Sequence, residues 1–460
     1  GLLGWRYLVS RTHAKLTRAG QDSSHLLRQV NALALALGSI WGLCALSLFP
    51  LATPGEQMIL GMLAMIGPFA IDSIFPAFRV LAHDLRVDDA AIQQAISIYL
   101  LGYALMSLLH GALSDAFGRK PVILGGLCLF LLASVGCALA DTLHQLLVFR
   151  FIQGLSAGVG LIVGRAVIRD VYQGDDAQRM MSLVSMIFSI APAIAPIIGG
   201  YLLTWSDWQG IFWFLVALSL LMLVVVALLL PESHPADVRV PIHPVTLSQT
   251  YWDMGKSCPF RMLAFSGTLL FGGLFLYIAS APDYVLLHLG LDETQFGYFF
   301  VPTIAGMSVG AFVSGRLAGK FSGRKLVNIG FAVCALSMAA NLLYCATVER
   351  LTLPWAVLPL TGMAFGIALV FPILTIALLD LYPTIRGTAS SMQAFVSLMA
   401  NALIAGLLVP LVSKTPALQA AVGCLFVAGS YFFWWRYQRR AVITPECTNQ
   451  PMAFEPTDEL

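Results

Sequence analysis

The sequence predicts an all-α membrane protein whose twelve transmembrane helices form two pseudo-symmetric six-helix bundles, with an N-terminal extension that carries one further apolar segment. Three observations predict this fold. Of the 460 residues, 58% are hydrophobic and only 11% are charged, and the mean hydropathy is +0.82. Apolar runs of about 20 residues recur along the chain, and its two halves repeat one another. So few charges cannot cover a water-soluble protein of this size.

Thirteen apolar runs are long enough to cross a bilayer as helices. Helices are expected because each backbone group in lipid must find its hydrogen bond within its own segment. From Met58 onward the runs form two groups of six. They cover residues 31–52, 58–79, 91–112, 121–140, 146–168, 181–203, 211–231, 262–282, 297–318, 326–347, 354–379, 388–412 and 416–436.

A polar stretch with several prolines, Glu232 to Phe260, separates the two groups and is typical of a linker. The predicted domains are therefore an N-terminal extension, an N-terminal bundle, a central loop, a C-terminal bundle and a tail. Their bounds are 1–57, 58–231, 232–260, 261–437 and 438–460.

The two groups of runs share a short repeated string. GALSDAFGRK begins at Gly111, after the second run of its group, and GRLAGKFSGRK begins at Gly315, after the corresponding run of the other group. The repeat indicates an internal duplication. Two similar bundles that face each other around a central cavity are typical of alternating-access transporters.

Basic residues predict the orientation, because cytoplasmic loops carry an excess of Lys and Arg. If the run at Met58 starts in the cytoplasm, the inner loops and the tail hold sixteen basic residues. The outer loops then hold four, which are Arg79, Arg86, Arg350 and Lys414. Both ends of the twelve-span unit are therefore expected on the inner side.

Residues 1–57 do not fit this scheme. Their apolar run follows five basic residues, and a single extra crossing there would invert the asymmetry of everything that follows. Three interpretations stay open: a helix on the lipid surface, an upstream stretch that precedes a working protein beginning near Met58, or a true thirteenth span.

Asp72 is the strongest single candidate for a functional residue. It is the one charged residue between Glu56 and Arg79, inside the first span of the N-terminal bundle. A carboxylate at that depth is unfavourable unless it faces water or a partner, and such residues mark ion pathways and proton relays. The alternative is a polar packing residue. Arg150, about one turn inside the fourth span, is the predicted partner that keeps Asp72 ionised.

The loop Gly111–Lys120 is the second candidate site, as a conformational latch or as a plain positive anchor. Gly111 is expected to let two helices approach, Asp115 to accept from an Arg or a helix N-terminus, and Gly118 to allow a tight turn. Arg119 and Lys120 are expected at the inner headgroups. The second copy has Gly319 in place of the acid.

Small residues form a stripe in the fifth span and another in the eighth. The spacing predicts that these two helices pack closely between the halves. The stripe residues are Ala191, Ala195, Pro196, Gly199 and Gly200 in one span, and Gly306 and Gly310 in the other.

Together these strings resemble the major facilitator superfamily, over Met58 to about Tyr437. GALSDAFGRK resembles its signature between the second and third helices, and LLVFRFIQGLSAG its fourth-helix motif. SIAPAIAPIIGG is similar to the fifth-helix motif of the antiporter branch, with Ala195 where Gly is usual. IDSIFPAF, RDVY and IRGTASS are similar to the Bcr/CflA group of drug-resistance transporters, which implies proton-coupled export across the bacterial inner membrane.

The expected function is proton-coupled efflux of amphipathic drugs by alternating access. The alternatives are a facilitator or symporter of one small metabolite and, less favoured, a non-transporting receptor on the same scaffold. No phosphate-binding loop or nucleotide motif occurs, and the eight cysteines form no close pair at metal spacing, so we expect no enzyme, cofactor or metal. The net charge of +2 favours no nucleic acid. The expected partners are the substrate, protons and the bilayer, and we expect a monomer.

Overall fold

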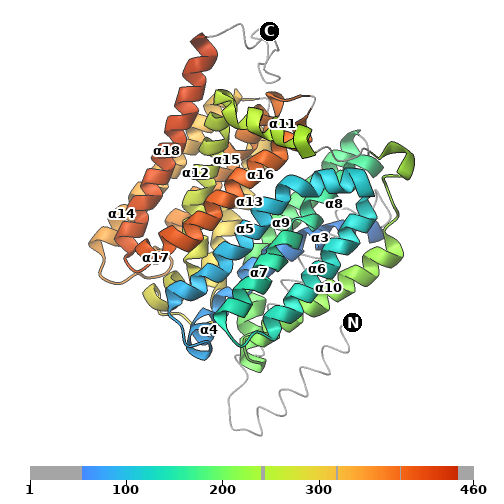
Figure 1. Cartoon of the computed structure of the whole chain (residues 1–460). Coiled ribbons are helices and arrows are strands. Elements are labelled where there is room, and N and C mark those ends of the chain that lie inside the picture. Colours follow the sequence, from blue (N-terminus) through green and yellow to red (C-terminus); the bar gives the residue numbers. More distant parts are fainter. Residues whose placement is uncertain (1–53, 173, 240–243, 318–319, 384, 444–460) are drawn as a thin grey trace. The chain divides into compact units, whose positions relative to one another are not determined.

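The computed structural model describes residues 54–172, 174–239, 244–317, 320–383 and 385–443 (Figure 1). Within these ranges every element of regular structure is a helix. Eleven of the described helices are long and apolar enough to span a membrane, and Ile190–Trp205 is a shorter apolar helix. The apolar run at 31–52 and Gly319 lie outside the described residues.

The first six spans occupy the part of the chain before the linker. They are formed by α3 (Pro54–Asp72) with η1 (Phe75–Ala77) and α4 (Phe78–Asp84), α5 (Asp89–Phe117), α6 (Arg119–Ala138), α7 (Leu143–Ala157) with α8 (Val159–Val171), α9 (Gly174–Trp205) and α10 (Gln209–Leu229).

The linker forms two short helices, and six further spans follow it. The linker helices are η2 (Ala236–Val238) and α11 (Pro244–Lys256). The spans are formed by α12 (Cys258–Ala279) with η3 (Asp283–His288), α13 (Gly297–Leu317), α14 (Gly323–Thr347), α15 (Leu358–Asp380), α16 (Arg386–Leu403) with η4 (Ile404–Leu408) and α17 (Val409–Val412), and α18 (Pro416–Ile443).

Three of the predicted continuous runs are interrupted. Pro76 has no N–H to donate to the carbonyl of Asp72, four residues earlier, and α3 ends at Asp72. Gly158 separates α7 from α8. The π-helix η4 separates α16 from α17, where Pro410 follows. Such irregular turns expose backbone groups inside the bundle, which is tolerated only where protein or water satisfies them.

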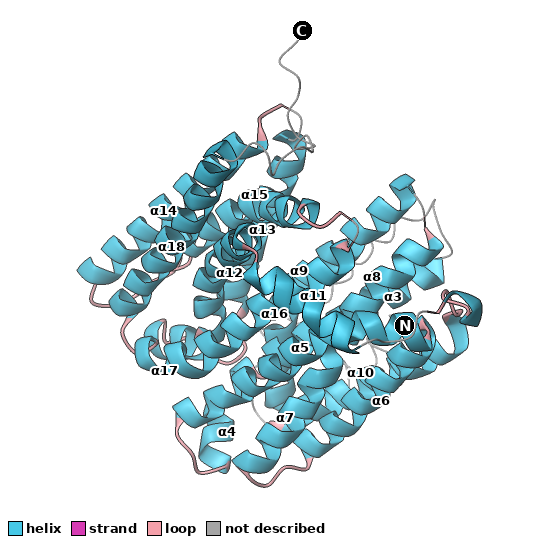
Figure 2. Cartoon of the chain, turned by 45° about the horizontal axis from the view of Figure 1, so that its top comes forward, coloured by secondary structure: helices cyan, strands magenta, loops and turns pink. Residues whose placement is uncertain are grey.

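The two halves meet through two pairs of helices that the internal repeat makes equivalent. The second span, α5, packs against the eleventh, α16, and the fifth, α9, packs against the eighth, α13. Figure 2 shows α5 beside α16 at the centre of the molecule. The second and fifth spans of one half thus meet the fifth and second spans of the other, which is consistent with two halves related by a pseudo-two-fold axis.

The helical unit has two ends. The linker end carries the loop Gly111–Lys120 and α11, and the far end carries α4, η3 and α17 (Figure 1).

Candidate functional site

Asp72 lies at the break in the first span. Its side chain is only 4% exposed, and within the described part of the chain no hydrogen bond or ion pair reaches its carboxylate. The next residue, Ser73, donates to the carbonyl of Phe69 at 2.6 Å and so closes the end of α3. The structure therefore places a carboxylate in a nearly dry interior without a counter-ion at contact distance, an arrangement that is rare in membrane spans.

Arg150 is fully buried in the middle of α7. Its Nη1 donates to the carbonyl of Ala70 at 2.8 Å and to Oε1 of Gln153 at 2.7 Å, and its Nε donates to the carbonyl of Ala95 at 3.2 Å. The guanidinium carbon lies 4.4 Å from the ring centre of Tyr99. Arg150 thus joins the first, second and fourth spans.

The expected ion pair between Asp72 and Arg150 does not form in the structure, so this prediction is wrong. The guanidinium reaches the backbone of the first span at Ala70, not the carboxylate, because nearby carbonyls and Gln153 take its hydrogen bonds and Tyr99 covers its face. Its Nη2 has no partner among the described residues.

Tyr99 contacts Arg150 through its ring and was missed by the sequence reasoning. Its hydroxyl donates to the carbonyl of Gly67 at 3.0 Å, and both Asp72 and Arg150 act on it electrostatically. Gln153 was also unassigned, and its Nε2 donates to Ser134 of the third span at 2.8 Å. A tyrosine in an apolar span does not stand out in the sequence, so Tyr99 could not be singled out. Gln153 could, because it lies three residues after Arg150 and therefore on the same face of the helix.

The predicted loop Gly111–Lys120 forms an ionic network at the linker end, but most of it is helical: Gly111 to Phe117 end α5, Arg119 and Lys120 begin α6, and only Gly118 lies between the helices. Arg119 contacts Oδ1 of Asp115 at 2.5 Å and Oδ2 of Asp170, at the end of α8, at 2.9 Å. Its side chain is 8% exposed, so it lies inside this network. Arg119 therefore joins the second, third and fourth spans by charge-assisted hydrogen bonds.

The linker completes this network. Glu232 accepts from the backbone N–H of Arg119 at 3.0 Å and of Lys120 at 3.3 Å, which are unpaired donors at the start of α6. Lys120 Nζ donates to the carbonyl of Ala227 at 2.9 Å. The sequence analysis did not predict a role for Glu232 or Asp170, although Asp170 belongs to the RDVY string. Acidic residues close to a helix start or to an arginine could have indicated both.

The two glycines of the loop differ. Gly118 has a φ of 95°, and a Cβ there would meet Glu232 Oε2 at 2.6 Å, so the expected tight turn is confirmed. Gly111 was expected to face a helix, and this is wrong: nothing lies within 4 Å of the position of a Cβ on it.

The small-residue stripes have different partners from those expected. The fifth and eighth spans do pack together, but Gly306 and Gly310 face carbonyls of α15 in their own half. Gly199 faces the carbonyl of Ser73, directly after Asp72, and Gly200 faces the carbonyl of Glu293 just before α13. One glycine therefore contacts the break in the first span, and its neighbour contacts the other half. Ala191 and Ala195 are fully buried in α9, and Pro196 is buried beside them.

The halves are hydrogen-bonded to each other at the far end. Three side chains of α5 donate to backbone carbonyls of the other half, at distances of 2.8, 2.8 and 2.7 Å; the pairs are Gln93 with Ala279, Gln94 with Gly406, and Ser97 with Ala402. The acceptors lie at the end of α12, within the π-helix η4 and at the end of α16, where helix irregularity frees carbonyls.

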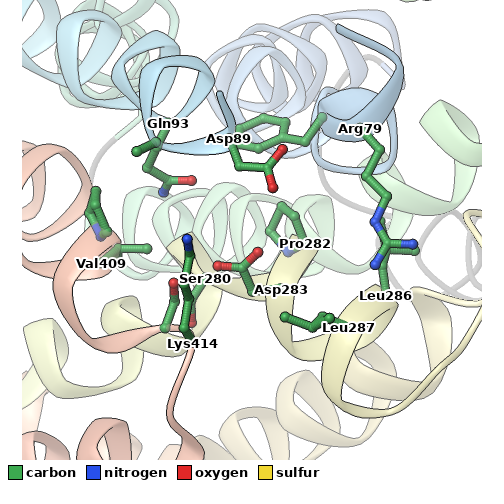
Figure 3. Close-up of a pocket in the computed structure, with 14 residues that line it drawn as sticks. Arg79, Asp89, Gln93, Ser280, Pro282, Asp283, Leu286, Leu287, Val409 and Lys414 are labelled. Atoms are coloured by element: carbon green, nitrogen blue, oxygen red, sulfur yellow. The ribbon is translucent and has the colours of Figure 1, made fainter. Parts of the chain in front are cut away.

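A pocket of about 90 Å³ lies beside these bonds and is lined by both halves (Figure 3). Arg79 and Asp89 face it from one half, and Asp283 and Lys414 from the other. None of these four forms an ion pair with another within the described residues.

At the linker end, the helix α11 bridges the halves. The hydroxyl of Tyr251 donates to the carbonyl of Leu108 in α5 at 2.9 Å, and it is hydrogen-bonded to Ser391 of α16. Burial raises the pKa of Tyr251 above its ordinary value, so the hydroxyl stays protonated and available as a donor.

Comparison with known proteins identifies the family. The family profile described as Major Facilitator Superfamily matches residues 58–405, more than half of the chain. A bicyclomycin resistance protein homolog of Haemophilus influenzae is 27% identical over 82% of this chain and 95% of its own length. Multidrug resistance protein D of Escherichia coli K12 is 28% identical over 76% of this chain and 87% of its own.

Solved structures support the same fold. A bacterial homolog of the human lysosomal transporter Spinster, inward-facing and occupied, superposes with a TM-score of 0.65 at 17% identity, over 84% of this chain and 98% of its own. A D-xylose–proton symporter superposes with a TM-score of 0.62 at 15% identity, over 83% and 97%. The chain is a multi-pass membrane protein that belongs to the major facilitator superfamily of transporters.

Proposed function

We propose that this protein exports amphipathic drugs in exchange for protons, by alternating access, across the bacterial inner membrane. The observation that carries the proposal is Asp72, a nearly dry carboxylate at the break in the first span with no counter-ion at contact distance. Such a group binds and releases a proton as its surroundings change, because only the neutral form is favoured in low dielectric. An ion gradient is the available energy source, since the sequence holds no nucleotide-binding motif.

The proposed orientation puts the linker end in the cytoplasm. The sixteen-to-four excess of basic residues supports it. In this orientation the far-end hydrogen bonds from Gln93, Gln94 and Ser97 close the outer side of the transporter. Release of drug to the outside then requires these bonds to part, while the network around Arg119 holds the linker end of the N-terminal half together.

The substrate class follows from relatives and from the cavity-forming spans. Both curated relatives described above are named for drug resistance, and the spans of this chain hold few amide groups but many Phe, Met and Tyr. Apolar and aromatic walls suit bulky amphipathic compounds, whereas a sugar or metabolite site needs several converging polar groups. We propose that the protein works as a monomer.

A growth-inhibition panel of unrelated antibiotics tests the proposal in a host that lacks its own efflux pumps. The wild-type protein should raise the inhibitory concentration of several amphipathic drugs, and Asp72→Asn should abolish this while still reaching the membrane. The amide has nearly the same shape but carries no exchangeable acidic proton. Asp141→Asn, an exposed acid between α6 and α7, is the matched control and should behave as wild type.

Proton release from the purified protein provides the second readout. Adding a drug from the panel should release protons from the wild type and not from Asp72→Asn. If Asp72→Asn still releases protons, Asp72 has no part in coupling. If wild-type cells gain no resistance but accumulate one metabolite, the protein is a facilitator or symporter instead.

A further inference from the structure

The two described parts of the linker lie on opposite halves. The first part lies on the N-terminal half, where Ser233 donates to Oδ2 of Asp170 at 3.1 Å and Nε2 of His234 is hydrogen-bonded to the carbonyl of Asp115 at 3.2 Å. The second part, α11, packs against α12 and α16 of the C-terminal half (Figure 2). One residue, Ser257, separates α11 from α12. We therefore expect α11 to move with the C-terminal half.

Tyr251 reaches from α11 to the other half. Its hydroxyl donates to the carbonyl of Leu108 in α5 at 2.9 Å and is also hydrogen-bonded to Ser391 in α16. The residues after it hold α11 in place: Met254 is 2% exposed, and a Cβ on Gly255 would lie 3.7 Å from Met392 of α16. A single hydroxyl on a seated helix thus joins the two halves.

The Tyr251 contact joins the same two helices that are bonded at the far end. There Ser97 of α5 donates to the carbonyl of Ala402 in α16 at 2.7 Å. Leu108 follows Ser97 by eleven residues, and Ser391 precedes Ala402 by eleven, so both lie in regular helix on the way to the linker end. At 1.5 Å per residue the two contacts are about 16 Å apart. Hydrogen bonds thus join α5 to α16 both at the far end and toward the linker end.

The carbonyl of Leu108 is open to a second donor. In a regular helix it already accepts the N–H of Ala112, and one lone pair remains. Side chains three and four residues later lean back over such a carbonyl, and here they belong to Gly111 and Ala112. Nothing lies within 4 Å of the position of a Cβ on Gly111. The small residues that begin the string GALSDAFGRK therefore leave this acceptor accessible.

We infer that the hydroxyl of Tyr251 is a releasable clamp that holds the linker end closed and must leave Leu108 before that end can open. The inference rests on the alternating access of the proposed function. When α5 and α16 part at the linker end, α11 moves with α16, so the bond to Leu108 breaks and the bond to Ser391 is kept. A neutral hydrogen bond suits a contact that breaks in every cycle, because its net contribution is small.

The test measures distances across the linker end by pulsed electron paramagnetic resonance, with the full chain in lipid nanodiscs. Spin-label amino acids are incorporated at Phe117 and Phe321, so the native cysteines stay unchanged. Both side chains are exposed, and they hold corresponding positions in the two repeated strings. A second pair, at His83 and Thr415, reports on the far end, where both residues are exposed.

Three variants are compared with wild type. Tyr251→Phe removes only the hydroxyl, so the ratio of closed to open linker-end distances should fall by about two- to tenfold, as for one neutral hydrogen bond. The far-end distances should not lengthen. Ser391→Ala should act in the same direction and less strongly. Thr250→Val is the matched control and should behave as wild type, because the hydroxyl of Thr250 donates to Thr246 within α11.

An unchanged distance ratio in Tyr251→Phe overturns the inference. So does an equal shift in Thr250→Val, which indicates that α11 has merely loosened, and so does lengthening at both ends, which indicates unfolding. These distances need neither drug nor proton, so the clamp can fail while drug export is confirmed by the resistance panel. If wild type and all variants show one fixed linker-end distance, the proposed alternating access is refuted and the clamp with it.

Discussion

Arg150 should hold the N-terminal bundle together, and replacing it by Met tests this role directly. In the structure its guanidinium donates to two backbone carbonyls, at Ala70 and Ala95, and to the side chain of Gln153. Arg150→Met leaves these three buried acceptors without a donor, at about 1–3 kcal/mol each. Removing a buried charge with an unpaired Nη2 offsets part of this.

The expected net loss is about 3–5 kcal/mol of stability, as for breaking other buried charge networks. The apparent melting temperature of the purified protein in detergent should therefore fall by roughly 5 °C or more. Arg150→Lys keeps the charge, but its single ammonium lacks the planar fork that serves separate acceptors, so it should fall between wild type and Arg150→Met. Arg169→Met is the matched control, because Arg169 is exposed at the end of α8.

A double-mutant cycle distinguishes a structural role of Arg150, in hydrogen bonds between spans, from an effect of its positive charge on transport. If Arg150 and Gln153 belong to one network, the loss in Gln153→Leu should be much smaller in an Arg150→Met background than in wild type. The reasoning is refuted if Arg150→Met melts together with Arg169→Met while export is lost, since Arg150 would then act through its charge on the transport site and not as a tie between spans.

Three further changes probe the contacts of the two ends. Gly199→Ala pushes a methyl group into the carbonyl of Ser73 beside Asp72. Export should therefore fall severalfold, with a modest loss of stability of about 1–3 kcal/mol. Normal export by this variant would show that the break in the first span does not matter for transport. Gly118→Ala is strained by its φ of 95° and should lower the yield of folded protein; thermal melting checks it. Gln94→Leu removes the bond to Gly406 and should shift spin-label distances across the far end toward the open form.

Much of the fold could be predicted because its cause is local. Twelve apolar segments, the linker that begins at Glu232 and the repeated string all follow from composition and spacing, since lipid admits only segments that satisfy their own hydrogen bonds. Asp72 and Arg150 could be singled out for the same reason, because a charge within an apolar run is conspicuous. Pro76 and Gly158, which accompany two of the helix breaks, were visible in the sequence, but both runs were predicted as continuous helices.

Partners between helices depended on the tertiary structure. Spacing shows that Gly306 and Gly310 share a face, but not that this face turns toward α15 instead of α9. Likewise no sequence pattern tells that the fork of Arg150 ends on the carbonyl of Ala70, two residues short of Asp72. Rotation of each helix about its axis and its depth in the bundle decide these contacts, and both are set by the packing of all spans together. The sequence by itself determined which groups enter the membrane, and only the tertiary structure decided which of them meet.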